Sequence, residues 1–186
     1  LESIIAQVFK RYRTTETSIM LDKLKDLGFK HSTLSGITFS LSDVVPSEKK
    51  PAIIEDTRKV VEKIEKQYKR GLITDYERHS KIVEAWEHAK DLVSEDLEQM
   101  EANNPDNPVF MMIQSKARGS ISQLVQMSGM RGTMAKPNGE TLEIPILASF
   151  REGLDVQEFF LSTHGSRKGT ADTALKTAEA GYLTRR

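Results

Sequence analysis

The feature that most constrains the fold is a heptad-like hydrophobic pattern over residues 52–102, interrupted once at RGLITD (70–75). Apolar side chains recur at helical spacing on both sides of this interruption. Gly71 suits the position that follows a helix C-terminus, and Thr74 with Glu77 three residues later is a capping-box sequence for the start of a second helix. The sequence therefore predicts an antiparallel helical hairpin with its tip near Arg70–Asp75.

The apolar stripe on this hairpin is narrow, so most of the hairpin surface is expected to lie in water. Long arms of this kind often project from a protein body and dock a partner. A purely structural coiled coil is the simpler alternative, and the stripe by itself does not separate the two interpretations.

The region before the hairpin, residues 1–46, has a mixed pattern. We expect a helix over 1–12 and a second helix that Thr17 caps and Gly28 ends. Apolar residues then alternate with polar ones, which predicts a half-buried strand within 37–45. The alternating residues are Ile37, Phe39 and Leu41.

The region after the hairpin begins with a helix-breaking NNPDNP stretch at 103–108. A helix-rich segment follows, and KPNGE at 136–140 then predicts a turn in which Gly139 has a positive φ, as the loop of a small β-hairpin. Ser149 is a candidate cap for a long final helix. Three glycines interrupt that helix, at a cost of about 0.5–1 kcal/mol each relative to alanine. They are Gly165, Gly169 and Gly181.

These elements predict a mainly α fold with a long antiparallel helical hairpin and a long C-terminal helix, and with small β elements near 37–45 and 140–146. The pattern also divides the chain into four parts of different character. They are 1–46, the hairpin at 47–104, the helix-rich segment with its hairpin loop at 105–150, and the final helix at 151–186.

Composition and motif content limit the possible functions. The 27 basic and 27 acidic residues cancel, so a contact with nucleic acid requires a local basic patch. The chain has no cysteine, which removes disulfides and thiolate metal ligands, and no apolar run of the length that spans a bilayer. It also has no phosphate-binding loop, hydrolase nucleophile motif or metalloprotease motif, and its 4 histidines are far apart. The residues by themselves contain no complete catalytic site.

The final helix combines small residues with cations. Thr173, Ala174 and Thr177 lie near Lys176, and Arg185 follows about two turns later. A face of small side chains lets a flat or bulky partner approach the backbone, and the flanking cations suit phosphates. This arrangement fits a helix that lies against a nucleic-acid duplex. A helix buried between other helices is the alternative, because small residues also permit close packing.

Five motifs occur in a fixed order along the chain: ARGS (117–120), GMRG (129–132), FREGL (150–154), THGSRKG (163–169) and GYLTRR (181–186). Together they closely resemble the bacterial DNA-directed RNA polymerase β′ subunit, and the resemblance covers essentially the whole chain. In order, the four parts resemble the end of the pore region, the rim helices of the secondary channel, the F-loop region, and the start and middle of the bridge helix.

The resemblance implies that the chain is part of a nucleotidyltransferase that makes RNA on a DNA template. The bridge helix of the family crosses the active-site cleft and alternates between straight and bent forms, with Gly165 and Gly169 as the matching hinges. Arg118 matches the arginine that reaches the phosphates of the incoming nucleotide. The face beside the template matches Thr173, Ala174, Lys176, Thr177, Tyr182 and Arg185.

Two supporting elements follow from the same resemblance. Arg131 and Met134 match the F-loop, which supports the bridge helix from behind. Regulators of the secondary channel, transcript-cleavage factors among them, are expected to dock near the hairpin tip. Their docking face matches Glu77, Lys81 and Glu84.

The catalytic aspartates and the trigger loop of the family lie outside this chain. The chain alone is therefore expected to contain no catalytic residue, to bind no cofactor or metal and to be inactive, whereas Mg²⁺ and Zn²⁺ belong to the full subunit. The expected partners are the β, α, ω and σ subunits, template DNA, RNA, nucleoside triphosphates and secondary-channel factors. The expected location is the cytoplasm, in association with the nucleoid and without membrane contact.

The chain departs from the family pattern at several positions. Lys116 stands where glycine is usual before the ARGS motif, and Thr133 and Thr170 stand where leucine is usual, which removes apolar contact between bridge helix and F-loop. Ser166 replaces alanine, and Ala180 replaces serine. A free-standing helical interaction module without a catalytic role is the alternative interpretation of the whole chain, and an independent nucleic-acid binder is a weaker one.

Overall fold

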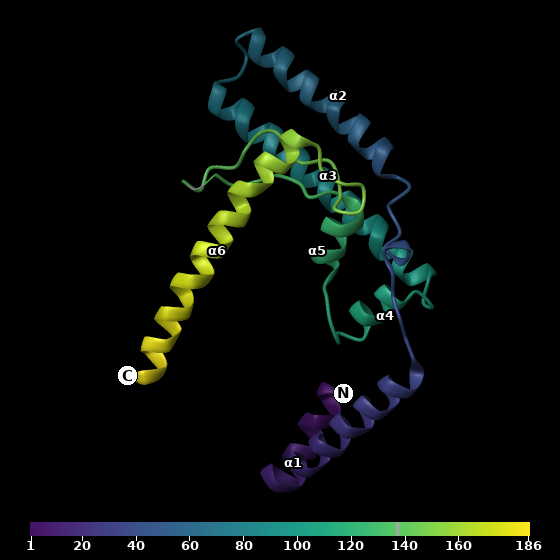
Figure 1. The fold of residues 1–186 in the computed structure, drawn as a ribbon. Coiled ribbons are helices and arrows are strands. Elements are labelled where there is room, and N and C mark those ends of the chain that lie inside the picture. The colour runs from purple at the N-terminus through teal and green to yellow at the C-terminus, as the bar shows by residue number, and fades with distance from the viewer. Residues whose placement is uncertain (137) are drawn as a thin grey trace. The chain divides into compact units, whose positions relative to one another are not determined.

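The computed structural model describes residues 1–136 and 138–186 and is mainly α-helical, as the sequence predicts. It divides into two compact units, residues 1–39 and residues 40–186. The second unit contains both the predicted hairpin and the final helix (Figure 1).

Helix α1, Glu2–Ser35, makes up most of the first unit and contains one break. The break is at Arg13, whose φ of 64° and ψ of −160° are not helical, and the Thr17 hydroxyl donates to the Arg13 carbonyl at 2.6 Å. The two predicted helices are present, but Thr17 lies inside the second one and does not cap it. Gly28 does not end the helix either, because one internal glycine costs only about 1 kcal/mol. The helix continues to Gly36, which has the left-handed conformation.

The predicted strand within 37–45 is wrong. The segment contains the short 3₁₀ helix η1, Leu41–Asp43, instead. The Asp43 carboxylate accepts a hydrogen bond from the Ser40 backbone N–H at 2.6 Å, so the chain closes a local turn where a strand would need a partner. The apolar residues that suggested a strand are 59–64% exposed, namely Ile37, Phe39 and Leu41.

The predicted hairpin is confirmed. Helix α2, Lys50–Lys69, and helix α3, Asp75–Asn103, pack against each other in antiparallel directions (Figure 1). The Glu77 backbone N–H donates to Thr74 Oγ1 at 3.3 Å, and the Thr74 N–H donates to the Glu77 carboxylate at 2.8 Å, so the predicted capping box forms. Gly71 has a positive φ of 73°, as expected after the end of α2.

One hydrophobic core joins the hairpin to the short helices that follow it. These are helix α4, Pro108–Gln114, helix α5, Ile121–Leu124, and the π-helical turn η2, Val125–Gly129. Gly129 permits a close approach to α3, because a β-carbon at this residue would lie 2.7 Å from Val93 Cγ1. The buried members of the core are Ile64, Ile82, Trp86, Ala89, Val93, Leu97, Phe110, Leu124, Val125 and Met130.

Charged residues fix the open end of the hairpin. Asp96 of α3 is 6% exposed, and its carboxylate accepts from Ser47 Oγ at 2.6 Å and pairs with Lys49 Nζ at 2.7 Å. Burial raises the pKa of Asp96, but hydrogen bonds from Lys49 and Ser47 outweigh it and hold the pKa below its ordinary value. The buried Lys50 Nζ lies 2.5 Å from Glu152 Oε2, which fixes the start of α2 to the segment before the final helix.

We call residues 130–154, between η2 and the final helix, the interhelix loop. It folds back on itself, as predicted near 140–146, but through isolated antiparallel bridges and without a continuous strand. Gly139 has a φ of 92°, which confirms its predicted conformation, and Pro137 of the predicted turn lies outside the described residues. The bridges join Gly132 with Ile146 and Ala135 with Thr141.

The final helix is α6, Val156–Arg185, and it continues through all three of its glycines. Its N-cap is Asp155, whose carboxylate accepts from the Val156 N–H at 2.7 Å. Ser149, the predicted cap, is therefore wrong. Ser149 is buried and forms a separate turn with Glu152, and Gly153, with a φ of 86°, ends this turn before α6 begins.

Candidate functional site

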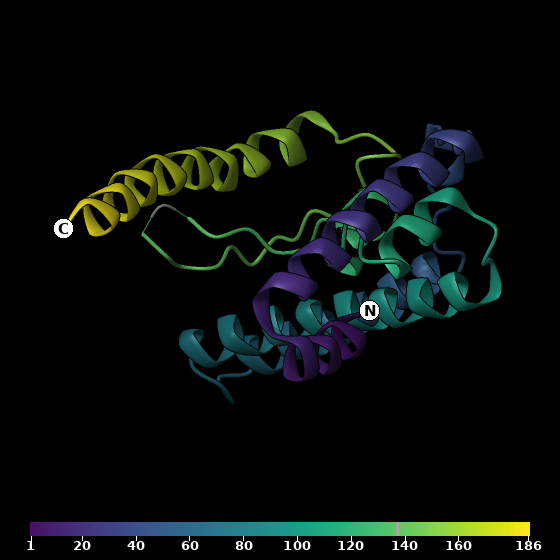
Figure 2. The same cartoon turned by 90° about the horizontal axis from the view of Figure 1, so that it is seen from below.

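The C-terminal half of α6 is the most exposed part of the predicted site. Every residue from 171 to 186 is exposed, and the helix runs unbroken toward the C-terminus (Figure 1, Figure 2). Even its large apolar side chains lie in water, with Leu175 66%, Tyr182 68% and Leu183 77% exposed. Among residues 40–136 and 138–186, no other helix covers the small-residue face.

The small-residue face of α6 has its hydroxyl donors satisfied within the helix. Thr173 Oγ1 donates to the Gly169 carbonyl and Thr177 Oγ1 donates to the Thr173 carbonyl, each at 2.8 Å. This face therefore offers a partner mainly van der Waals contact. Lys176 and Arg185 take part in none of the ion pairs found among the described residues, which leaves their charges available to an anion.

Arg118 is exposed in the loop between α4 and α5, and two residues in the left-handed conformation shape this loop. Lys116 has a φ of 57° and Gly119 has a φ of 88°. A non-glycine residue in this conformation is strained, because its β-carbon crowds the backbone. The glycine that the resemblance leads us to expect at position 116 would thus suit this backbone conformation.

The interhelix loop contacts both α3 and α6, and Figure 2 draws it between them; it carries the predicted F-loop residues. Met134 meets α6 at Gly165, where a β-carbon would lie 3.3 Å from Met134 Sδ. Nearer the start of α6, the Glu158 carboxylate accepts from the backbone N–H groups of Leu147 and Ala148 at 3.1 and 3.3 Å. The loop is thus attached to α6 at two places.

Arg131 and Gly169 have different surroundings from Met134 and Gly165. The Arg131 guanidinium lies over the Phe150 ring, 4.8 Å from its centroid, and its Nε is buried without a hydrogen-bond partner among the described residues. Gly169 has open space where a β-carbon would stand. Of the two predicted hinges, Gly165 is the one that lies against the loop.

The predicted docking face at the hairpin tip is only partly free. Glu77 takes part in the capping box, and hydrogen bonds from the Thr74 backbone and hydroxyl lower its pKa. Lys81 and Glu84 are exposed, and Glu84 shares a groove of about 370 Å³ with Tyr76, which is 81% exposed. Sequence reasoning missed Tyr76, because a single exposed aromatic residue leaves no periodic signal.

A charged cluster that the sequence did not predict joins the start of α3 to the interhelix loop. Arg78 donates two parallel hydrogen bonds to Glu143, from Nη1 at 2.8 Å and from Nη2 at 2.9 Å, and His79 Nδ1 lies 2.9 Å from the same carboxylate. Hydrogen bonding from Arg78 lowers the pKa of Glu143. Arg78 and Glu143 are 65 positions apart, so no local pattern reveals the pair.

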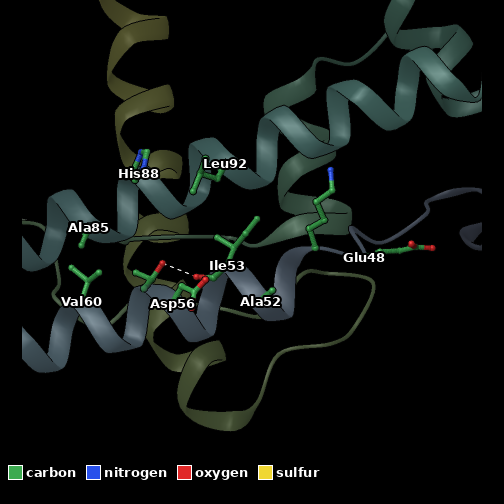
Figure 3. Close-up of a pocket in the computed structure, with 10 residues that line it drawn as sticks. Glu48, Ala52, Ile53, Asp56, Val60, Ala85, His88 and Leu92 are labelled. Atoms are coloured by element: carbon green, nitrogen blue, oxygen red, sulfur yellow. Dashed lines mark hydrogen bonds between the residues drawn. The ribbon is translucent and has the colours of Figure 1, made fainter.

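A larger groove of about 660 Å³ lies between α2 and α3 (Figure 3). Its lining is mostly apolar and contains none of the predicted site residues. The apolar side chains include Ile53, Val60 and Leu92, and the charged or titratable ones are Glu48, Lys49, Asp56 and His88.

The predicted residues therefore occupy three separate places: α6 with its supporting loop, the loop between α4 and α5, and the hairpin tip. Among residues 1–136 and 138–186, no group of three or more His, Asp or Glu side chains is placed to hold a metal ion. In the same described part of the chain, no helix is both long enough and apolar enough to cross a membrane.

Comparisons with known proteins agree on one family. Three protein-family models match the chain, each describing one domain of RNA polymerase Rpb1. Domain 3 matches residues 1–44, domain 4 matches residues 73–154 and domain 5 matches residues 153–186. The DNA-directed RNA polymerase subunits beta' of Leuconostoc mesenteroides and Enterococcus faecalis are each 56% identical to the chain, and that of Streptococcus suis is 54% identical. Each comparison covers the whole chain, which spans 15% of the length of each relative.

Proposed function

The chain belongs to the family of DNA-directed RNA polymerase β′ subunits, and on that premise we propose that it positions the incoming nucleotide and the template DNA during RNA synthesis. In this proposal α6 is the bridge helix, and the α2–α3 hairpin forms the rim of the secondary channel where regulatory factors dock. The four predicted parts then correspond to the end of the pore region, the rim helices, the F-loop region and the bridge helix.

The exposed half of α6 is the observation that carries the proposal. Thr173, Ala174 and Thr177 present little bulk and no free hydroxyl donor, so a base pair can approach the helix closely. Lys176 and Arg185 are exposed cations that suit template phosphates. The exposed ring of Tyr182, further along the same helix, offers a surface on which a base or sugar can stack.

Arg118 is the residue that we assign to the phosphates of the incoming nucleotide. Its guanidinium can donate paired hydrogen bonds to phosphate oxygens and stabilise the charge that develops during phosphoryl transfer. The exposed position of Arg118 supports this role. Gly165 and Gly169 act as hinges of α6, with Met134 and Arg131 on the loop behind it.

Nucleotide addition also needs groups that we place elsewhere in the enzyme. The family resemblance places the Mg²⁺ and Zn²⁺ sites in other parts of the β′ subunit, and we derive no step through them. The partners in this proposal are the β, α, ω and σ subunits, template DNA, RNA, nucleoside triphosphates and the regulators of the channel. The assembly works in the cytoplasm, at the nucleoid.

The proposal is tested by nucleotide addition in complete RNA polymerase whose β′ subunit carries Arg118→Ala. Loss of a charge-assisted hydrogen bond to a phosphate costs about 1.5–3 kcal/mol, which predicts kcat/KM for nucleotides lower by about 10- to 160-fold. Lys116→Ala removes a neighbouring exposed cation and is the matched control, with an expected change of less than about twofold. Wild-type nucleotide kinetics in the Arg118→Ala enzyme would remove the substrate role.

The role of α6 has a separate structural test. In a map of the assembled enzyme with template DNA, Lys176 and Arg185 are expected to lie within reach of template phosphates. If both side chains point away from the template strand, α6 is not the template surface.

A further inference from the structure

Arg78 makes contacts with three different elements. Its Nε and Nη2 donate to Asp75 Oδ1 at 3.1 and 2.9 Å, within the first turn of α3. Its guanidinium also lies over the ring of Tyr68 near the end of α2, 5.2 Å from the centroid. The two hydrogen bonds to Glu143 then reach the interhelix loop. Arg78 thus ties the hairpin tip to the loop.

The Arg78–Glu143 contact has the geometry of a strong pair. Both Glu143 oxygens accept from Arg78, and one of them also lies 2.9 Å from His79 Nδ1. The Arg78 side chain is 19% exposed and the Glu143 side chain is 30% exposed, so water screens the pair less than a surface ion pair. A planar, bidentate contact also fixes orientation, which a single ammonium group cannot do.

A short series of contacts links Glu143 to α6. The N–H of the adjacent Leu142 donates to the Met134 carbonyl at 2.7 Å, and Met134 is the residue that lies against Gly165. Because the described part of the loop forms isolated bridges and no continuous strand, its contacts with η2, α3 and α6 help to determine its position.

We propose that the Arg78–Glu143 pair positions α6 for nucleotide addition by fixing the interhelix loop to the hairpin tip. This inference rests on the proposed function of α6 as the template-facing helix. It makes Arg78 and Glu143 positioning residues, because their hydrogen bonds lie within α3 and the loop and do not involve the template-facing residues of α6. It also means that a protein bound at the hairpin tip, where Asp75 and Tyr68 lie, acts on α6 through the loop when it draws Arg78 away from Glu143.

The experiment uses complete RNA polymerase with the β′ variants Arg78→Ala, Glu143→Ala and the double variant. Displacement of a positioned element lowers turnover, so each single variant is expected to lower kcat about tenfold with less than about a twofold change in KM for nucleotides. Because the two residues act as one unit, the double variant should be no slower than the slower single variant. Arg58→Ala, at an exposed residue of α2, is the matched control and should turn over at the wild-type rate.

Conservative variants keep the test decisive if an alanine variant does not assemble. Arg78→Lys keeps the charge but loses the paired geometry, so its kcat should lie between the values of wild type and Arg78→Ala. If Arg78→Ala does not assemble, Glu143→Gln gives the lower reference value. Wild-type kcat in assembled Arg78 and Glu143 variants overturns the inference, and so do single effects that multiply in the double variant. The Arg118→Ala enzyme in the same assay separates the two proposals. If Arg118→Ala is impaired and the Arg78 variants are not, the positioning role alone fails, whereas wild-type kinetics for Arg118→Ala remove the underlying function.

Discussion

Met134 packs against α6 at Gly165, a residue without a side chain: a β-carbon there would lie 3.3 Å from Met134 Sδ, whereas a β-carbon at Gly169 would meet nothing within 4 Å. The two glycines that the sequence suggested as hinges therefore differ in what surrounds them. Gly165 makes room for the loop, and Gly169 lowers helix propensity without making room for anything.

This difference predicts that the same substitution, glycine to alanine, stabilises α6 by different amounts at the two positions. Gly169→Ala should stabilise α6 by about 0.5–1 kcal/mol, because alanine has the higher helix propensity and its methyl group meets no neighbour. Gly165→Ala should gain less, because Met134 must move by a few tenths of an ångström. Amide hydrogen exchange along α6 measures the gain, and Gly181→Ala, whose β-carbon also meets nothing, should behave like Gly169→Ala. Equal protection in the Gly165 and Gly169 variants would contradict the packing argument.

Lys116 offers a prediction about backbone strain. Its φ of 57° suits glycine, so Lys116→Gly should raise the free energy of unfolding by about 0.5–1 kcal/mol. Lys116→Ala keeps a β-carbon and should give no such gain. Urea unfolding of the chain, followed by circular dichroism, measures both variants. A gain shared by the alanine variant would point to loss of the lysine charge and not to relief of strain.

Asp96 offers a prediction about a buried carboxylate. Asp96→Ala should lower the free energy of unfolding by about 1–3 kcal/mol, because the buried Ser47 hydroxyl loses its acceptor. Glu95→Ala removes an exposed carboxylate from the adjacent position of α3 and should change stability by less than about 0.5 kcal/mol. The comparison uses the same urea titration, and similar losses in the two variants would show that the Ser47 contact adds nothing.

The Arg78–Glu143 pair predicts a pH dependence of stability. The pKa of Glu143 is lower in the folded chain than its ordinary value of 4.5, so the pair stabilises the fold above that pH. This stabilisation is lost as the pH falls below about 4.5 and through the folded pKa, because the unfolded chain binds the proton more readily.

The measurement is the free energy of unfolding at a series of pH values between neutral and acidic. Glu143→Gln should be less stable than wild type at neutral pH, and the gap should close in acid. Glu98→Gln, at an exposed residue of α3, controls for the loss of one carboxylate from the surface. A gap between wild type and Glu143→Gln that stays constant down to acidic pH would rule out the charge of Glu143 as its cause.

Local sequence signals predicted those elements that local contacts hold in place. The Thr74–Glu77 capping box lies within four consecutive residues, and the heptad-like pattern on either side fixes the hairpin faces. Gly139 was predicted in the same way, because a turn of this kind requires a positive φ within a few residues. Ser149 shows the limit of such signals, since Ser149 and Asp155 each have a glutamate three residues later and only Asp155 begins α6.

Elements that depend on distant partners were not predictable from the sequence. The alternation of Ile37, Phe39 and Leu41 suits a strand, but a strand needs a neighbour, and the described part of the chain supplies none at that place. The pairing of Arg78 with Glu143 depends on how the loop folds back on α3, which no short pattern encodes. The functional roles of Arg118 and of the residues on α6 were assigned from the family resemblance, and these roles are still predictions.

The isolated bridges of the interhelix loop also have an evolutionary consequence. A segment whose shape depends on its neighbours cannot be transferred between proteins with its native conformation unless those neighbours are transferred too. A chimaera that receives only residues 130–154 from a distant relative should therefore lose the native course of this segment, even when every exchanged residue is acceptable in its own right. The shape should return once the donor's counterparts of Arg78 and Gly165 are transferred with it.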